Sequence, residues 1–210
     1  MTRGEMMEEK KVIKVADIRK EAEGLKCPVQ MALYYIDGFL KGPMCGRCFP
    51  CAFGSYEAKL RLQSIIDREG TEDDINALKR IADEMLIASF CKKGKDTANY
   101  LMEFLGTGVF EEHLKGVCPD EVCPEYVRYK VIGERCINCG ECKKVCKHHA
   151  ILGQTRKNRF QSGFPPFEIR DKRCTRCGEC LPVCPTGAIV LIERKTGKVI
   201  KEKDVAQEVS

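Results

Sequence analysis

Residues 136–184 decide the architecture, because they contain one cysteine pattern written twice: Cys136-Ile-Asn-Cys-Gly-Glu-Cys-Lys-Lys-Val-Cys146, and then Cys174-Thr-Arg-Cys-Gly-Glu-Cys-Leu-Pro-Val-Cys184. Each run is spaced C-x2-C-x2-C-x3-C, and 27 residues separate the two runs. Three thiolates from one such tight loop can converge on a single [4Fe–4S] cubane. Gly140 and Gly178 lie between the second and third cysteines of each run, where a close turn with positive φ is easiest for glycine.

Across about residues 127–194 the sequence resembles the eight-iron ferredoxin family, with all eight ligand positions matched. In that family the fourth cysteine of each run binds the other cluster. The resemblance therefore implies two [4Fe–4S] clusters, one held by Cys136, Cys139, Cys142 and Cys184, and the other by Cys174, Cys177, Cys180 and Cys146. A zinc knuckle is the alternative for any single C-x2-C pair, but the doubled order of the eight cysteines disfavours it.

The composition favours a metalloprotein of a reducing compartment. Fifteen of the 210 residues are cysteine, and their spacings are those of metal sites rather than of a disulfide framework. The N-terminus shows no apolar leader, and no apolar run approaches the ~18 residues that a transmembrane helix needs. We therefore expect a cytoplasmic chain without a membrane span.

The formal net charge of +5 does not indicate nucleic-acid binding. That charge counts every cysteine as neutral, whereas a cubane held by four thiolates carries a net charge of about −2. Three such clusters, the third of which is argued next, would bring the net charge of the chain to about −1. No RRM, zinc-finger or helix-turn-helix signature is present.

A third cysteine group begins at Cys45-Gly-Arg-Cys-Phe-Pro-Cys51, after an expected helix over residues 28–41. The next cysteine is Cys91, forty positions on. Between them we expect an antiparallel pair of helices over about residues 56–68 and 71–89. Such a pair returns the chain to its start, so that Cys91 can complete a set of four thiolates.

Two further features support this helical region. Thr71 and Asp74 have the spacing of a capping box at the start of the second helix. A further helix over residues 97–105 would complete a small bundle.

Residues 28–105 resemble the C-terminal iron–sulfur domain of the NADH-binding subunit of respiratory complex I, which also occurs in diaphorase subunits of NAD-linked hydrogenases and formate dehydrogenases. The resemblance rests on the motif GPMCGRCFPCAFG, the helical pair and the lone cysteine that follows it. It implies a third [4Fe–4S] cluster on Cys45, Cys48, Cys51 and Cys91. The family has Glu-Ser and Arg-Glu where this chain has Pro43-Met44 and Ala52-Phe53. A zinc site is the alternative.

The sequence contains neither G-x-G-x-x-G nor G-x-x-x-x-G-K-[ST], and we find no counterpart of the flavin- and NADH-binding region that precedes this domain in the family. We therefore expect this chain to bind neither NAD nor FMN. Taken together, the two regions resemble the C-terminal part of the diaphorase-like subunit of electron-bifurcating hydrogenases, in the form of a separate subunit.

His113, Cys118 and Cys123 form a further group with the spacing H-x4-C-x4-C. Thiolate and imidazole together are a zinc-type donor set, and a structural zinc site takes four ligands. Cys27 is the one cysteine that no other group uses, so it could be the fourth. Two interpretations stay open, namely a zinc site on these four residues, or buried thiols beside a helix-end histidine. A fourth iron–sulfur cluster is less favoured because the group contains no C-x2-C pair.

The sequence thus predicts an α+β chain in five parts. These are a charged N-terminal segment (1–26), a helical cluster domain (27–108), a His/Cys linker (109–126), a two-cluster ferredoxin domain (127–198) and a charged, mobile tail (199–210). Within the first part, Lys11–Ile18 favours either a short strand or a tail. Strands are also expected over residues 168–170 and 189–192.

No catalytic acid/base pair, nucleophile or open metal site is indicated. We therefore expect an electron-transfer subunit of an NAD(P)-linked oxidoreductase complex, and an electron-bifurcating complex is one candidate. It would relay electrons between a flavin on a partner subunit and ferredoxin or a further redox subunit. One alternative is a catalytic subunit that binds flavin at an unrecognised site, which flavin absorbance in the purified chain would reveal. Another is a zinc-dependent scaffold without redox chemistry, which metal analysis would reveal.

Overall fold

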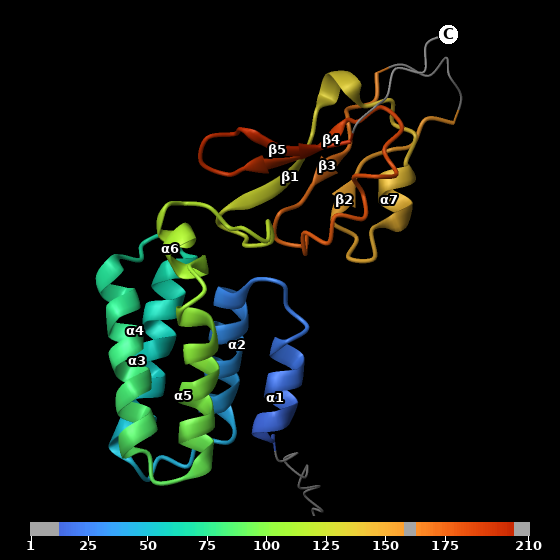
Figure 1. The fold of residues 1–210 in the computed structure, drawn as a ribbon. Coiled ribbons are helices and arrows are strands. Elements are labelled where there is room, and N and C mark those ends of the chain that lie inside the picture. Colours follow the sequence, from blue (N-terminus) through green and yellow to red (C-terminus); the bar gives the residue numbers. More distant parts are fainter. Residues whose placement is uncertain (1–12, 158–162, 204–210) are drawn as a thin grey trace, which may run out of the picture. The chain divides into compact units, whose positions relative to one another are not determined.

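The structure is a computed structural model that describes residues 13–157 and 163–203. The chain divides into two compact units, Met1–Val117 and Cys118–Ser210. The first unit is helical, and the second contains two small antiparallel sheets and short helices (Figure 1). The predicted α+β class, a helical region followed by a ferredoxin-like one, is confirmed.

The first unit is a helical bundle. Its helices are α1 (Val15–Ala22), α2 (Pro28–Lys41), α3 (Phe49–Ile66), α4 (Glu72–Ala88), α5 (Lys92–Leu105) and α6 (Val109–Leu114). α3 packs against α4, α4 against α5, and α2 against both α3 and α5, so these four helices enclose one core. Each of the four contributes apolar side chains at helical spacing to that core. The fully buried members include Val29, Ile36, Ala58, Leu62, Leu78, Ala82, Met85, Ala98 and Leu101.

The expectation of a strand or a tail over Lys11–Ile18 is wrong, although its first two residues lie outside the described part of the chain. The segment enters helix α1, in which Ile18 and Ala22 are four residues apart and both buried. They pack against Tyr35 of α2 and Tyr100 of α5. The two tyrosine rings stack with their centroids 4.1 Å apart. Helical spacing places the apolar side chains of α1 on this aromatic pair, whereas a strand would separate them.

Two helices match their predictions and two begin earlier than predicted. α2 has the predicted bounds, and α4 differs from its prediction by one residue at each end. α3 begins at Phe49 rather than near residue 56, and α5 begins at Lys92 rather than at residue 97. Each of these two helices follows directly on a cysteine in extended conformation, Cys48 or Cys91. The first turns of α3 do not show the apolar stripe of a buried helix, because Phe49 and Phe53 are exposed.

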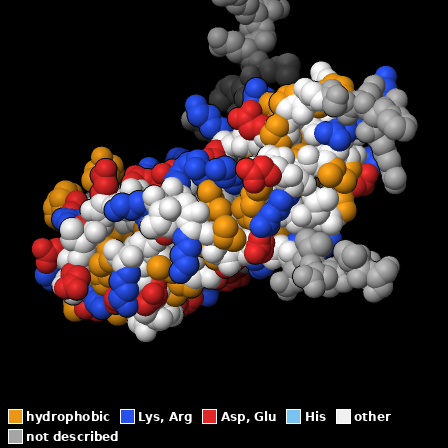
Figure 2. Space-filling view, turned by 90° about the horizontal axis from the view of Figure 1, so that it is seen from above, with side chains coloured by type: hydrophobic (Ala, Val, Ile, Leu, Met, Phe, Trp, Pro, Cys, Tyr) orange, Lys and Arg blue, Asp and Glu red, His pale blue; other side chains and the backbone are white. Residues whose placement is uncertain are grey.

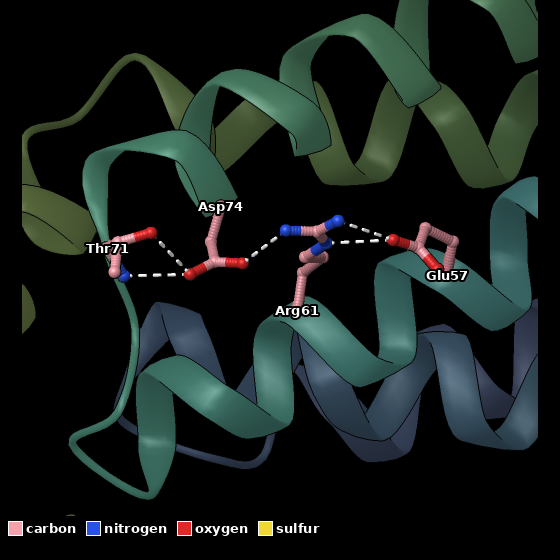
Figure 3. Close-up of polar contacts among 4 residues, drawn as sticks. All are labelled: Glu57, Arg61, Thr71 and Asp74. Atoms are coloured by element: carbon pink, nitrogen blue, oxygen red, sulfur yellow. Dashed lines mark hydrogen bonds and ion pairs between the residues drawn. The ribbon is translucent and has the colours of Figure 1, made fainter.

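The predicted capping box at the start of α4 is confirmed. The carboxylate of Asp74 accepts hydrogen bonds from the backbone N–H of Thr71 at 2.7 Å and from its hydroxyl at 2.9 Å. The other carboxylate oxygen of Asp74 accepts a hydrogen bond from Arg61 of α3 at 2.8 Å, and Arg61 also pairs with Glu57 (Figure 3). One carboxylate therefore caps α4 and ties it to α3.

In the second unit the sheets are built so that the two cysteine runs meet. β1 (Val127–Val131), β4 (Ile189–Glu193) and β5 (Val199–Glu202) form one sheet in the order β1-β4-β5, and β2 (Ile151–Leu152) pairs with β3 (Glu168–Ile169). All pairs are antiparallel. The two predicted strands are confirmed as β3 and β4. Because the strand before the first cysteine run pairs with the strand after the second, the start of the first run and the end of the second lie close together.

The expectation of a mobile tail from residue 199 is wrong for its first part, because Val199–Glu202 forms β5. β5 pairs with β4 through a hairpin whose turn contains Gly197, with φ of +73°. Its side chains are all exposed, so backbone hydrogen bonds rather than burial hold it in place. Residues 204–210 lie outside the described part.

Two surface properties of the described residues bear on function. No described helix has the length and apolar character needed to cross a membrane. On the face drawn in Figure 2, Lys and Arg side chains are interspersed with Asp and Glu rather than gathered into one basic field.

Candidate iron–sulfur and zinc sites

The helical unit brings four predicted ligands together at the ends of two helices. Cys48 caps α3, Cys51 lies in its first turn, and Cys91 caps α5. Cys48 and Cys51 are buried against Phe39 of α2. Cys45 and Cys91 are exposed. The group therefore has one side in the core of the bundle and one side at its surface.

The acid–base character of Cys51 shows how close these thiols are. The pKa of the Cys51 thiol is raised to about 12, first by burial and then by the neighbouring Cys48, Cys91 and Cys45. Cys51 resists ionisation in this way because a buried thiolate is poorly solvated and negative charge on the neighbouring thiols disfavours it. Bound iron reverses this preference, since cysteine binds metal as thiolate.

Two residues that sequence reasoning missed show that the site fits a bulky sulfur-rich group. A Cβ atom at Gly94 of α5 would lie 2.7 Å from the Ser89 hydroxyl oxygen and 3.2 Å from the Cys51 sulfur. Ser89 is 4% exposed, and its hydroxyl has no hydrogen-bond partner among the described residues. A buried hydroxyl normally has a partner. A cluster sulfur held by the four cysteines would supply one.

In the ferredoxin-like unit, one cavity is lined by Cys136, Cys139, Cys142 and Cys184, together with Phe167, Ile189 and other residues. Its volume is about 280 Å³, including its open mouth. The pKa of the Cys142 thiol is raised to about 11, first by burial and then chiefly by neighbouring Cys139 and Cys184. The cavity thus collects the first predicted set, including the fourth cysteine of the other run.

A second cavity of about 340 Å³ is lined by Cys146, Cys174, Cys177 and Cys180. Tyr129 of β1 also lines it, which the sequence did not indicate. The pKa of the Cys180 thiol is raised to about 12, first by burial and then by neighbouring Cys174, Cys177 and Cys142. This cavity collects the second predicted set. The two cavities therefore exchange their fourth cysteines, as the ferredoxin resemblance implies.

The fourth cysteine of each run has the same backbone environment. The sulfur of Cys146 accepts a hydrogen bond from the N–H of Ala150 at 3.3 Å, and the sulfur of Cys184 accepts one from the N–H of Ala188 at 3.2 Å. Burial raises the pKa of the Cys184 thiol, but hydrogen bonds from Thr186 and from backbone N–H groups outweigh it, so the net shift is downward. Such N–H groups stabilise a thiolate ligand.

The cysteine loops also share a backbone shape. Gly140 and Gly178 have φ values of +83° and +85°, so the positive φ predicted for both is confirmed. Two positions earlier, Asn138 and Arg176 also have positive φ, at +54° and +59°. Sequence reasoning missed the latter pair, since Arg is not a residue type that marks such a turn.

The His/Cys group is also brought together. The ligand atoms of Cys27, His113, Cys118 and Cys123 all lie within 4.8 Å of one another, and all four residues are buried. Nδ1 of His113 lies 2.7 Å from the carbonyl oxygen of Val109, and Nε2 lies 3.4 Å from the sulfur of Cys27. A proton on Nδ1 would satisfy that carbonyl and leave Nε2 as a metal ligand. A tetrahedral zinc ion with ~2.3 Å bonds to sulfur places its sulfur ligands about 3.8 Å apart, which this group can accommodate.

All fifteen cysteines lie in the described part of the chain, and none of them forms a disulfide. Twelve fall into the three groups of four described above, and the other three join His113. Every thiol is therefore placed where the sequence pattern predicted a metal ligand. Sequence reasoning missed four neighbouring residues. Tyr129 is distant in sequence from most of the cysteines whose cavity it lines, and Ser89, Gly94 and Arg176 lie close to cysteines in the sequence but carry no recognisable spacing.

Comparison with known proteins agrees with this arrangement. Residues 30–114 match the NADH-ubiquinone oxidoreductase-F iron–sulfur binding region, and residues 135–188 match the 4Fe–4S dicluster domain. A curated relative is the NADP-reducing hydrogenase subunit HndC of Solidesulfovibrio fructosivorans, 30% identical over 138 residues. Those residues are 62% of this chain and 27% of the relative, so the similarity spans about a quarter of that protein. The chain therefore matches these two iron–sulfur regions one after the other, which confirms the predicted fusion of two such regions.

Proposed function

We propose that the chain is the iron–sulfur electron-transfer subunit of a multi-subunit, NAD(P)-linked cytoplasmic oxidoreductase. The observation that carries this proposal is the convergence of twelve cysteines into three groups of four, one in the helical unit and two lining cavities of the ferredoxin-like unit. Support also comes from the two matched iron–sulfur regions and from the relative named as a subunit of an NADP-reducing hydrogenase.

Each group would hold one [4Fe–4S] cluster. The ligands would be Cys45, Cys48, Cys51 and Cys91 in the helical unit, and the two exchanged sets in the ferredoxin-like unit. When bound, such a cluster takes up and releases one electron at a time. The protein contributes the rest of the chemistry. Its apolar walls limit water, its backbone N–H groups hydrogen-bond to Cys146 and Cys184, and its charged side chains set the local potential.

The proposal is tested by iron and sulfide analysis of the anaerobically reconstituted chain. Three clusters correspond to about twelve iron atoms per chain. Cys45→Ser should lower the iron content to about eight, and Cys177→Ser should lower it independently. A wild-type content near eight that Cys45→Ser leaves unchanged would show that the helical unit holds no cluster. Flavin absorbance in the isolated chain would favour the alternative of a catalytic flavin-binding subunit.

We also propose that Cys27, His113, Cys118 and Cys123 hold one structural zinc ion. Four buried ligand atoms within 4.8 Å of one another, with a histidine oriented by a backbone carbonyl, support it. Metal analysis should find about one zinc per chain in anaerobically purified protein. Cys118→Ala combined with Cys123→Ala should remove the zinc, and Cys45→Ser should retain it. Full zinc in the double variant would place the ion elsewhere.

The proposed electron donor or acceptor of the helical unit is a flavin-bearing partner subunit. The exposed side of its cysteine group is flanked by apolar side chains, since Phe49 follows Cys48 and is 75% exposed, and Phe90 precedes Cys91 and is 85% exposed. Exposed aromatic side chains of this kind mark interaction surfaces. Lys92 and Lys93 follow Cys91 and are exposed as well. A partner surface with an apolar centre and an acidic rim would complement this one.

A further inference from the structure

Between their first and third cysteines, the two cysteine loops of the ferredoxin-like unit have the same backbone and one difference in charge. Lys143 and Lys144 follow the third cysteine of the first run only, and both are exposed. Asn138 and Arg176 occupy the same place, between the first and second cysteines of their runs, with φ values of +54° and +59°. Both side chains belong to buried residues, with exposures of 2% for Asn138 and 8% for Arg176. One loop therefore buries a neutral amide where the other buries a guanidinium, which stays protonated.

The contacts of Arg176 leave its charge close to the loop. Its Nε donates to the carbonyl oxygen of Val127 at 3.0 Å, and its Nη1 donates to that of Cys174 at 2.7 Å. Both acceptors are neutral. Among the described residues, Arg176 pairs with the carboxylate of Asp171, which is 3.9 Å from Nη2, and the other oxygen of that carboxylate binds Arg194 at 3.0 Å. The positive charge of Arg176 is thus only partly offset, and it lies beside the ligand Cys174.

The corresponding side chain of the sister loop is neutral. In the sister loop, the Asn138 amide donates to the carbonyl oxygens of Pro165 at 2.7 Å and Gln154 at 3.4 Å, and it brings no charge. Lys203 does approach that side, with its amine 3.1 Å from the Cys184 carbonyl oxygen. Lys203 is only partly buried, however, so solvent and salt screen it more than they screen Arg176.

We propose that Arg176 is a potential-setting residue, which gives the cubane bound by Cys146, Cys174, Cys177 and Cys180 the higher reduction potential of the two in this unit. Reduction adds one electron and no proton, so it increases the negative charge held by the four thiolates. A buried positive charge favours the reduced state more than the oxidised one, and it does so most strongly where water is excluded. When the two cubanes together hold one added electron, that electron therefore resides mainly on the cubane beside Arg176.

This inference rests on the ligand assignment of the proposed function, so iron analysis is performed on every variant. The measurement is an EPR-monitored potentiometric titration of the reconstituted full chain. Arg176→Asn reproduces the side chain of the sister loop and should lower the reduction potential of one cluster. The expected change is about tenfold in the reduction equilibrium, or ~59 mV for one electron. The reduction potentials of the other clusters should not change. The cluster whose potential changes is assigned to this unit by its persistence in Cys45→Ser protein.

Two variants serve as controls. Arg173→Gln removes a positive charge next to the same cysteine but from an exposed side chain, so it should change the reduction potential much less. Arg176→Lys keeps the charge and should keep the potential. Full iron in Arg176→Asn with every potential unchanged, or an equal shift in Arg173→Gln, would overturn the role of Arg176 and leave the proposed function intact. A wild-type chain that binds no iron in this unit would overturn the proposed function itself.

Arg176→Asn could fail to fold, because the Val127 carbonyl would lose its buried donor. Asp171→Asn avoids this problem, since an amide oxygen can still accept from Arg194. It removes the negative charge nearest to Arg176, so the reduction potential of the same cluster should rise instead of fall. A potential that falls or stays unchanged in iron-replete Asp171→Asn protein would contradict the proposal without any variant at Arg176.

Discussion

Ser89 places a buried hydroxyl beside Cys51 without a hydrogen-bond partner among the described residues. An unsatisfied buried donor costs about 1–3 kcal/mol, so it is expected to have a function. The hydroxyl can donate to a sulfur atom of a cluster held in the helical unit. Hydrogen bonds to cluster sulfurs stabilise the reduced, more negative state.

Ser89→Ala should therefore keep the iron content near that of the wild type and lower the reduction potential of the cluster in the helical unit, because one donor to sulfur is lost. An EPR-monitored titration measures the shift, and iron analysis confirms occupancy. Ser64→Ala changes a serine of α3 that lies outside the cysteine group and serves as the control. A potential equal to that of the wild type would show that the Ser89 hydroxyl does not reach the cluster.

At this scale the sequence predicted which cysteines come together and missed the other side chains that lie beside them. Cysteines in C-x2-C-x2-C runs are recognisable because a short loop is enough to bring their sulfurs together. Ser89 and Arg176 have no such local mark. The position of Ser89 depends on how the end of α4 and the start of α5 meet near Cys51, and that of Arg176 depends on how β1 passes the second cysteine loop. Neither arrangement can be predicted from residue spacing.

Among the helices, Asp74 makes the contact with the clearest dependence on pH. Its carboxylate caps α4 and pairs with Arg61 of α3 (Figure 3). Burial alone would raise the pKa of this carboxyl, but Arg61 and the hydrogen bonds from Thr71 outweigh burial and lower it. A lowered pKa in the folded state means that the folded protein favours the charged form more than the unfolded chain does. The stabilisation is therefore complete above the unfolded pKa of about 3.9 and is lost as the pH falls through the lower, folded value.

Asp74→Asn should destabilise the helical unit by about 1 kcal/mol, the usual value of a helix cap, which lowers Tm by roughly 4 °C. Thermal melts followed by circular dichroism measure this change. Asp73→Asn removes an equal charge from an exposed position in the same helical turn and should lower Tm less. The difference between wild type and Asp74→Asn should be constant from pH 8 to 5 and should shrink below about pH 4. A difference that grows on acidification would contradict the assigned direction of the pKa shift.

The helices and strands that the sequence predicts correctly are those whose bounds follow from one local sequence feature. Pro28, the capping box at Thr71 and the apolar stripes of α2 and α4 each specify a boundary or a face. The starts of α3 and α5 were missed because the residues there are selected for the cysteine group and for exposure rather than for burial. β5 was missed for a related reason, since its side chains are all exposed and only its pairing with β4 defines it.

At the scale of the molecule, the chain carries cysteine groups for three clusters but no recognised nucleotide-binding motif. We therefore expect that NADH or NADPH does not reduce the isolated chain, and that either cofactor reduces it once the flavin-bearing partner is present. EPR of the isolated chain and of the assembled complex, recorded after addition of each nicotinamide, measures this. Reduction of the isolated chain by either nicotinamide would refute the assignment as an electron-transfer subunit without its own flavin.

The order of electron transfer can be tested in the same complex. If the helical unit receives electrons first, Cys48→Ser should block reduction of the ferredoxin-like unit, whereas Cys177→Ser should leave the helical unit reducible. Equally fast reduction of the ferredoxin-like unit in wild type and Cys48→Ser would show that electrons enter elsewhere.

The docking face can be tested separately in the same complex. Phe90→Asp keeps all twelve cysteines and should slow reduction in both units, because a negative charge at this exposed apolar position opposes docking of an acidic-rimmed partner. Unchanged reduction rates in Phe90→Asp, with full iron content, would show that this face is not part of the docking surface, and the proposed order of transfer would still stand.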